Sequence, residues 1–362
     1  TEPPVTQPPV TQPPATQPPA TQPPATQPPA TQGQNPTSST RKPTQAPQTA
    51  DPGPSQTIYV DTSNIYTNDL PQSMLNAMSN YYTFVIYGVD AHSQSTLLRW
   101  TNSDVVIIVS INKTTKEVRL ASIYRDTLIE GGNNYYDKIT NVYASQGVAG
   151  SLSAINRNFD LRINKFVTFN WKAVVDAVNV MGGVELKLTA AECEKINQTK
   201  GGVAAAVGVK TPRNLPVEDG TYQLDGVQVV SYARIRKLDS DIVRTQRQRK
   251  VITAMLNKAK TLPLTDLLGM VETVFSEIAT SFDFSEIVSL LSDISSYDLN
   301  NTAGYPTWYN SKDTIYIAGL MDNNARLHEF LFNNPNYSPS GYVFNLHDRL
   351  AYLRAISLGY DY

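Results

Sequence analysis

The sequence predicts an α/β fold in which a mixed central β-sheet is sandwiched by helices, preceded by a disordered spacer rich in Pro and Thr. Apolar runs of strand length alternate with helical patterns, and a strand–helix–strand unit spans residues 164–188. Residues 1–57 consist largely of Thr, Gln, Pro and Ala in TQPPV and TQPPA repeats, which have too little apolar surface to offset the entropy of folding. We therefore divide the chain into a spacer (1–57), a folded domain (58–298) and a Tyr-rich, partly helical C-terminal extension (299–362).

The first half of the folded domain is predicted to be a sheet with helices packed on it. Two apolar runs flank the polar turn NKTTK and are expected to form a hairpin. Asn170 is suited to cap a helix, since its side chain accepts hydrogen bonds from N–H groups of the first turn, and Gly182-Gly183 ends that helix. The predicted strands are 82–89, 105–111, 117–124, 164–169 and 184–188, and the predicted helices are 149–158 and 170–180.

The second half is predicted to be mainly helical. Residues 195–216 are rich in Gly and Ala and then contain Pro, so we expect a loop or an irregular insertion. A long helix follows Asp241 to about Lys260, and one or two helices lie within 265–298. In the extension we expect helices at 322–332, capped by Asp322, and at 346–357.

Composition excludes several classes of protein. The formal net charge of −2 argues against general nucleic-acid binding. The single cysteine, Cys193, excludes an internal disulfide and a cysteine-based zinc site, and three scattered histidines argue against a histidine-rich metal site. No run of 18 apolar residues occurs, so no segment of this sequence is expected to span a membrane. The chain begins with Thr, so we expect a removed leader or an N-terminal segment outside this chain, with the spacer holding the domain away from a surface.

Charged residues gather where three predicted strands begin or end. Asp104 precedes the second strand, and the antiparallel partner of that strand must end at the same edge, at Arg125 and Asp126. If the first strand is antiparallel to the second, Asp90 arrives there too. Two carboxylates in one cleft repel each other unless a cation or proton intervenes, and their oxygen ligands suit Mg²⁺ or a similar hard ion such as Mn²⁺. The alternative is that these residues merely end strands.

Positive charge is concentrated in SYARIRKLDSDIVRTQRQRK (231–250). Arg234 and Arg236 are two residues apart and point the same way on an extended chain. On the following helix, Arg244 and Gln248 continue the apolar stripe towards the N-terminus, so we expect them to face inward.

An inward arginine needs an anionic partner, because burying an unpaired charge is costly. Asp241 or Asp239 is one such partner, and phosphate oxygens at the helix N-terminus are the other. The additional charge of Arg234, Arg236 and Arg247 favours phosphate, since two aspartates cannot balance it. Arg249 and Lys250 lie off the stripe and are expected to be solvated.

These motifs, in this order, resemble the LytR–CpsA–Psr family of bacterial cell-wall glycopolymer transferases over about residues 82–260. The matching segments are YGVD (87–90), NSDVVIIVSIN (102–112), ASIYRDT (121–127), DKITNVYASQG (137–147), VDAVNVMGGVEL (175–186), LDGVQVVSYARIRK (224–237) and DSDIVRTQRQRKVI (239–252).

The resemblance implies a mixed sheet between helices with a deep apolar tunnel that holds a polyprenyl chain. It also implies an enzyme that moves a phosphate-linked polymer from undecaprenyl diphosphate onto peptidoglycan. Such an enzyme would act close to the membrane, on the extracytoplasmic face of a bacterial cell, through an N-terminal anchor outside this chain.

The resemblance assigns roles to individual residues. Asp90 and Asp104 would bind Mg²⁺ (or Mn²⁺) and, with Arg125, would be catalytic. The phosphate-binding residues would be Arg125, Arg234, Arg236, Arg244, Gln248 and Arg99, and the supporting residues would be Asp241, Lys138 and Arg247.

The sequence departs from the family pattern at two positions, where His92 and Asn102 stand in place of arginines; Arg99 lies nearby as a substitute. Two alternatives to glycopolymer transfer therefore stay open: pyrophosphate hydrolysis with water as acceptor, and a lipid-diphosphate-binding module or regulator that uses the same cleft. A carboxylate such as Asp126 is a candidate base.

Overall fold

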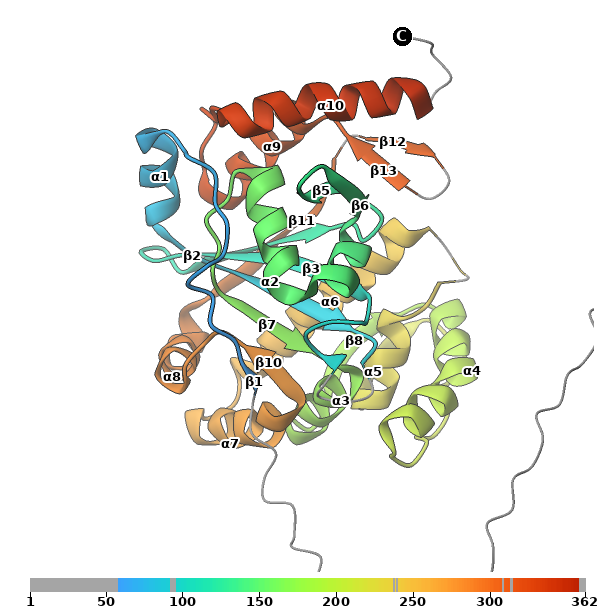
Figure 1. The fold of residues 1–362 in the computed structure, drawn as a ribbon. Coiled ribbons are helices and arrows are strands. Elements are labelled where there is room, and N and C mark those ends of the chain that lie inside the picture. The colour runs from blue at the N-terminus through green and yellow to red at the C-terminus, as the bar shows by residue number, and fades with distance from the viewer. Residues whose placement is uncertain are drawn as a thin grey trace, which may run out of the picture. The chain divides into compact units, whose positions relative to one another are not determined.

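The computed structural model describes residues 58–91, 96–236, 238, 240–307, 309–312 and 315–357. The spacer expected at 1–57, His92 and Asp239 lie outside these residues. The centre of the fold is a seven-stranded mixed sheet in the order β1-β10-β7-β2-β3-β4-β11 (Figure 1). Its strands are β1 (Ile58–Tyr59), β2 (Tyr81–Val89), β3 (Ser103–Asn112), β4 (Glu117–Ile123), β7 (Phe166–Phe169), β10 (Ile278–Thr280) and β11 (Asp298–Tyr305).

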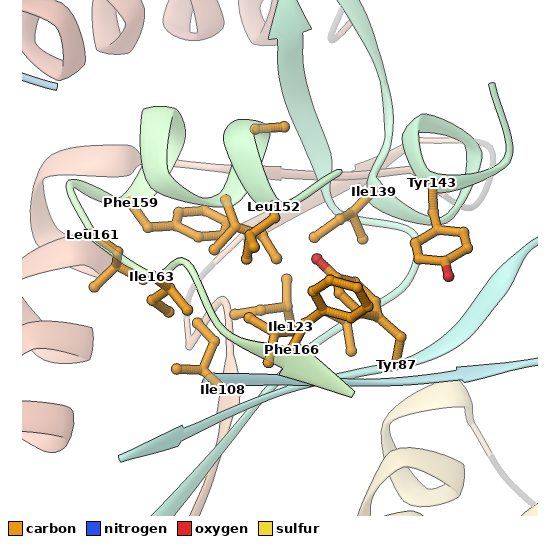
Figure 2. Packing of buried hydrophobic residues seen from close by; sticks show 14 of the residues in the cluster. Tyr87, Ile108, Ile123, Ile139, Tyr143, Leu152, Phe159, Leu161, Ile163 and Phe166 are labelled. Carbon is orange, nitrogen blue, oxygen red and sulfur yellow. The ribbon is translucent and has the colours of Figure 1, made fainter. Parts of the chain in front are cut away.

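One face of this sheet is covered by helices α2 (Ile139–Phe159) and α9 (Leu320–Phe332). Buried side chains of the strands, among them Ile108 and Ile123, pack against Leu152 and Phe159 of α2, as Figure 2 shows. These residues belong to the largest apolar core of the described chain. The expected arrangement of a mixed sheet between helices is confirmed on this face.

The opposite face is covered by α6 (Asp241–Ala259) and α8 (Phe284–Ser292). Beyond α6, a second core joins it to the hairpin β8 (Val184–Leu188)–β9 (Gly220–Leu224) and to four further helices. These are α3 (Trp171–Val180), α4 (Ala190–Val207), α5 (Gly226–Ala233) and α7 (Leu264–Val274). The remaining elements are α1 (Gln72–Ser79), β5 (Leu128–Gly132), β6 (Tyr135–Lys138), β12 (Tyr309–Lys312), β13 (Ile315–Ala318), α10 (Gly341–Ser357) and two short 3-10 helices (Phe275–Glu277 and Ile294–Ser296).

Most of the predicted strands are present. β2 is antiparallel to β3, and β3 forms the expected hairpin with β4. Asn170 caps α3 as expected, because its side chain accepts a hydrogen bond from the Ala173 N–H at 2.8 Å. The strand–helix–strand unit differs in one respect: β8 pairs with β9 outside the central sheet.

The predicted loop at 195–216 is wrong over most of its length, because α4 occupies Ala190–Val207. A reciprocal capping box between Thr189 and Glu192 starts this helix, and buried Ile196 and Val203 fix one side of it. These contacts offset the cost of the two glycines in the helix interior. The glycines had favoured a loop because a residue without a side chain destabilises a helix. Asp322 also lies inside the first turn of α9, whose N-cap is Gly319.

The described part of the C-terminal extension packs on the sheet. β11 runs parallel to β4 at the edge of the sheet, and α9 contacts β3 and β4. The Ser110 hydroxyl donates to the Leu331 carbonyl at 2.8 Å, and the Arg119 guanidinium donates to the Phe330 carbonyl at 2.7 Å. A boundary at residue 298 therefore falls at the start of an edge strand of the same sheet.

His328, on α9, should make the stability of the fold depend on pH. It is fully buried, one ring nitrogen lies 2.8 Å from the Phe159 carbonyl, and burial lowers the pKa of His328 from 6.5 to about 4. The unfolded chain therefore binds the extra proton, so we expect the free energy of unfolding to fall by up to about 3 kcal/mol as the pH decreases from 6.5 to 4. The free energy of unfolding, measured by denaturant titration at each pH, should change less between pH 6.5 and pH 4 in His328→Asn than in the wild type or in His347→Asn.

Candidate functional site

Three strand ends meet at one edge of the sheet. Val89 at the end of β2 pairs with Ser103 at the start of β3, so Asp90 and Asp104 belong to neighbouring strand ends. β4 returns from β3 to the same edge, where Arg125 and Asp126 follow it. The Tyr124 N–H donates to the Tyr305 carbonyl of β11 at 2.8 Å, which fixes the chain just before Arg125. The topology expected from the hairpin is confirmed.

Asp104 lies between two arginines from distant parts of the chain. Its Oδ1 accepts from Arg125 Nη1 at 2.6 Å, and its Oδ2 accepts from Arg236 Nη2 at 2.7 Å. Burial alone would raise the pKa of Asp104, but the hydrogen bond and charge of Arg125, with the charges of Arg244 and Arg236, hold that pKa below its usual range. Asp104 is therefore an anion at neutral pH, held in place by arginines.

Arg244 faces inward at the start of α6, as its position on the apolar stripe predicts. Only 2% of it is exposed, and its Nη2 lies 2.7 Å from Asp241 Oδ1, so the expected pair with Asp241 is present. Burial raises the pKa of Asp241, partly offset by Arg244 and Arg125. The Arg244 Nε atom is buried and has no hydrogen-bond partner among the described residues. Gln248, one turn further along α6, is buried as well.

The guanidinium of Arg234 stacks on the ring of Trp171, a residue that no sequence motif indicated. It lies 3.5 Å from the centroid of the Trp171 ring, at the start of α3. Burial lowers the pKa of Arg234, and Asp90 and Asp104 both act against this shift. Both aspartates are thus within electrostatic reach of one guanidinium. The only sequence signal for Trp171 was its position directly after the N-cap Asn170.

The other expected site residues lie around this group. Lys138 Nζ is 3.0 Å from Asp126 Oδ1, and Arg125 Nε is 3.6 Å from Asp126 Oδ2. Asp126 is buried between these cations, so it supports Arg125 and is poorly placed to act as a base.

Three arginines lie elsewhere or differ from expectation. Arg99 donates to the Ser145 carbonyl and stacks on Trp100, while Asn102 is exposed next to β3. Arg247 pairs with Glu192 of α4 at 2.8 Å, away from the aspartates. Arg249, expected to be solvated, is only 8% exposed, because it lies between β8 and β11, which both flank α6; Lys250 is exposed as expected.

The donor set suits a hard divalent ion. Asp90 and Asp104 offer carboxylate oxygens, and each Asp104 oxygen keeps a lone pair beyond its arginine contact. No cluster of three or more His, Cys, Asp or Glu side chains suited to a metal occurs among the described residues. The remaining ligands of such an ion would therefore be substrate oxygens or water.

Comparison with known proteins identifies the family. The model of the LytR_cpsA_psr family matches residues 54–316, so the chain belongs to the LytR_cpsA_psr family. The match extends past residue 260, where the resemblance of the motifs ended, and includes β11.

Relatives with assigned names are similar over part of their length. The polyisoprenyl-teichoic acid–peptidoglycan teichoic acid transferase TagT of Bacillus subtilis is 28% identical over 219 residues, 59% of this chain and 64% of that protein. Biofilm regulatory protein A of Streptococcus mutans is 25% identical over 248 residues, 66% of this chain and 56% of that protein. The chain thus spans less than two thirds of either relative.

A solved structure shows the same fold. The structure described as a LytR-CPS2A-psr family protein, YwtF (TagT), with bound octaprenyl pyrophosphate lipid has a TM-score of 0.53 and 19% identity. The alignment covers 78% of this chain and 97% of that chain. Among the described residues of our chain, no helix has the length and apolar character needed to cross a membrane.

Proposed function

We propose that this protein is a phosphotransferase that moves a glycopolymer from an undecaprenyl-diphosphate-linked precursor to peptidoglycan, close to the outer surface of a bacterial membrane. The observation that carries the proposal is the convergence of Arg125, Arg236, Arg244 and Arg234 on Asp104, with the Arg244 Nε buried and without a hydrogen-bond partner among the described residues. Family membership supports it, as do the name of TagT and the lipid bound in the YwtF structure.

A second observation concerns the lipid. On the face of the sheet that α6 and α8 cover, apolar side chains of the central strands remain partly exposed, including Phe84, Ile86 and Val105. Ile252 and Leu256 of α6 are likewise only partly buried. Incomplete burial of apolar residues in the middle of a fold supports a channel for a polyprenyl chain on this side, next to Asp104.

Different residues of the cluster have different roles in the proposed reaction. Mg²⁺ (or Mn²⁺), held by Asp90 and Asp104, would supply neutralisation of the diphosphate charge. Arg125, Arg236 and Arg244 bind phosphate oxygens, and their geometry is set in advance by Asp104 and Asp241. Stacking on Trp171 keeps Arg234 oriented.

The transfer step exchanges one phosphorus–oxygen bond for another. A peptidoglycan hydroxyl attacks the phosphorus that bears the polymer, and the bond to the bridging oxygen breaks, so that undecaprenyl phosphate leaves. The hydroxyl proton goes to a carboxylate. Asp241 is the candidate for this role, since burial raises its pKa and its Oδ2 atom has no hydrogen-bond partner among the described residues.

Transfer can be tested directly against hydrolysis and against binding alone. The purified chain is incubated with a lipid-diphosphate-linked glycan and Mg²⁺, with and without peptidoglycan. We expect the glycan to become covalently attached to peptidoglycan, with release of polyprenyl phosphate. Release of free phosphorylated glycan at the same rate in both reactions would instead identify a pyrophosphate hydrolase. Tight lipid binding with no turnover would identify a binding module or regulator.

A further inference from the structure

A polar groove of about 980 Å³ follows the side of α6 between the β8–β9 hairpin and β11. Residues of α6 form its floor, and Glu185 and Gln223 of the hairpin and Thr302 of β11 contribute to its walls. This groove is distinct from the group around Asp104, since Asp104, Arg125 and Arg236 are not among its lining residues.

Arg249 is the most unusual residue of this groove. It is only 8% exposed, and its Nη1 is buried without a hydrogen-bond partner among the described residues. Burial lowers the pKa of Arg249, and Tyr124 is the one group that counteracts this shift. In the described part of the chain no carboxylate pairs with this guanidinium, and burying an unpaired charge is costly, so this arginine is best explained by a ligand that brings negative charge.

The rest of the lining indicates which ligand. Lys250 and Lys258 add positive charge, and Glu185 is the one carboxylate among the lining residues. The other polar groups are mostly amides and hydroxyls, such as those of Gln223 and Asn257. Amides and hydroxyls suit the many hydroxyl groups of a sugar or polyol chain, and the surplus of cations suits phosphates or carboxylates along that chain.

The groove also begins beside the proposed reaction centre. Tyr124 directly precedes Arg125, and it is within electrostatic reach of both Arg249 and Asp241. Arg244 and Arg249 lie on the same helix, little more than one turn apart. A chain attached to a diphosphate at Arg125 and Arg244 would have to pass around α6 to enter this groove, because five residues turn the helix by about 140° beyond one full turn.

We infer that this groove binds an anionic glycan chain, with Arg249 as its anchor and Lys250 and Lys258 along its length. The inference rests on the proposed function, because it assigns the groove to one of the two glycans that the reaction joins. The shared chemistry is a hydroxyl-rich chain with regular negative charges. Its source is either the polymer on the lipid or the acceptor peptidoglycan with its peptide carboxylates.

The test measures binding of four probes to the full chain. Lipid-free poly(glycerol phosphate) represents the donor polymer, soluble peptidoglycan strands represent the acceptor, dextran oligomers are the neutral control, and a short polyprenyl diphosphate without glycan reports on the reaction centre. We expect two variants to bind one of the two anionic glycans about tenfold more weakly than the wild type does. They are Arg249→Gln and the double variant Lys250→Gln, Lys258→Gln. The matched control is Lys210→Gln, an exposed lysine outside the groove lining, which should bind all probes as the wild type does.

The outcomes separate this inference from the proposed function. The lysine variants should bind polyprenyl diphosphate within about twofold of the wild type, since exposed substitutions away from a contact cost little. If Arg249→Gln fails to fold, the lysine pair carries the test alone. If the groove variants bind both anionic glycans as the wild type does, or if Lys210→Gln loses as much affinity as they do, the assignment of the groove to glycan binding is wrong. The proposed diphosphate site would not be affected by either result. Failure of the wild type to bind polyprenyl diphosphate would count against the proposed function instead.

Discussion

Replacing Asp104 by alanine should abolish Mg²⁺-dependent transfer, with a loss of at least about 100-fold in kcat. Asp104 holds both Arg125 and Arg236 and is one of the two carboxylates proposed to bind the metal, so a single change removes a ligand and releases two arginines. Asp90→Ala should have a similar effect on turnover with a smaller effect on the arginines, because Asp90 is exposed and acts electrostatically on Arg234.

Metal binding should be measured alongside activity. Titration with Mn²⁺, followed by its electron paramagnetic resonance signal, should show one site in the wild type and much weaker binding in either variant. Asp266→Ala, an exposed position in the first turn of α7, is a matched control and should retain both properties. Full activity of the Asp90→Ala, Asp104→Ala double variant, or in excess chelator, would contradict the metal assignment.

Replacing Arg244 by alanine should lower the affinity for a soluble polyprenyl diphosphate by roughly one to two decades. A charge-assisted contact contributes about 1.5–3 kcal/mol, and each 1.4 kcal/mol corresponds to about a tenfold change in affinity. The variant should also lose stability, by about 3 kcal/mol, because the partly buried Asp241 then keeps only the more distant Arg125, whose Nε lies 3.8 Å from Asp241 Oδ1. Affinity must therefore be expressed per folded molecule, with the folded fraction measured by circular dichroism.

Lys250→Ala provides the comparison for Arg244. It lies on the same helix but is exposed, so its loss should change diphosphate affinity by less than about 0.5 kcal/mol. Equal affinity of the wild type, Arg244→Ala and Lys250→Ala would mean that Arg244 serves only to hold Asp241. A lower affinity in Arg244→Ala alone would support direct contact with phosphate.

Local patterns were sufficient for much of the fold and for part of the site. The apolar runs and the NKTTK turn predicted the β3–β4 hairpin, and antiparallel pairing then brought Asp104 and Arg125 to one edge. The 3.6-residue period of α6 placed Arg244 and Gln248 on its buried side. In both cases the relevant residues are related by the geometry of one hairpin or one helix, which the sequence encodes directly.

Other features depended on contacts between distant segments. The sequence by itself determined which sides of α6 are apolar, but it did not determine that β8 and β11 flank α6 at Arg249, or that α4 provides Glu192 for Arg247. Arg236 reaches Asp104 across 132 residues, and Trp171 meets Arg234 where α3 begins. Periodicity specifies the environment that a side chain needs, whereas the partner that supplies it is set by how separate elements pack, and only the tertiary structure decided that.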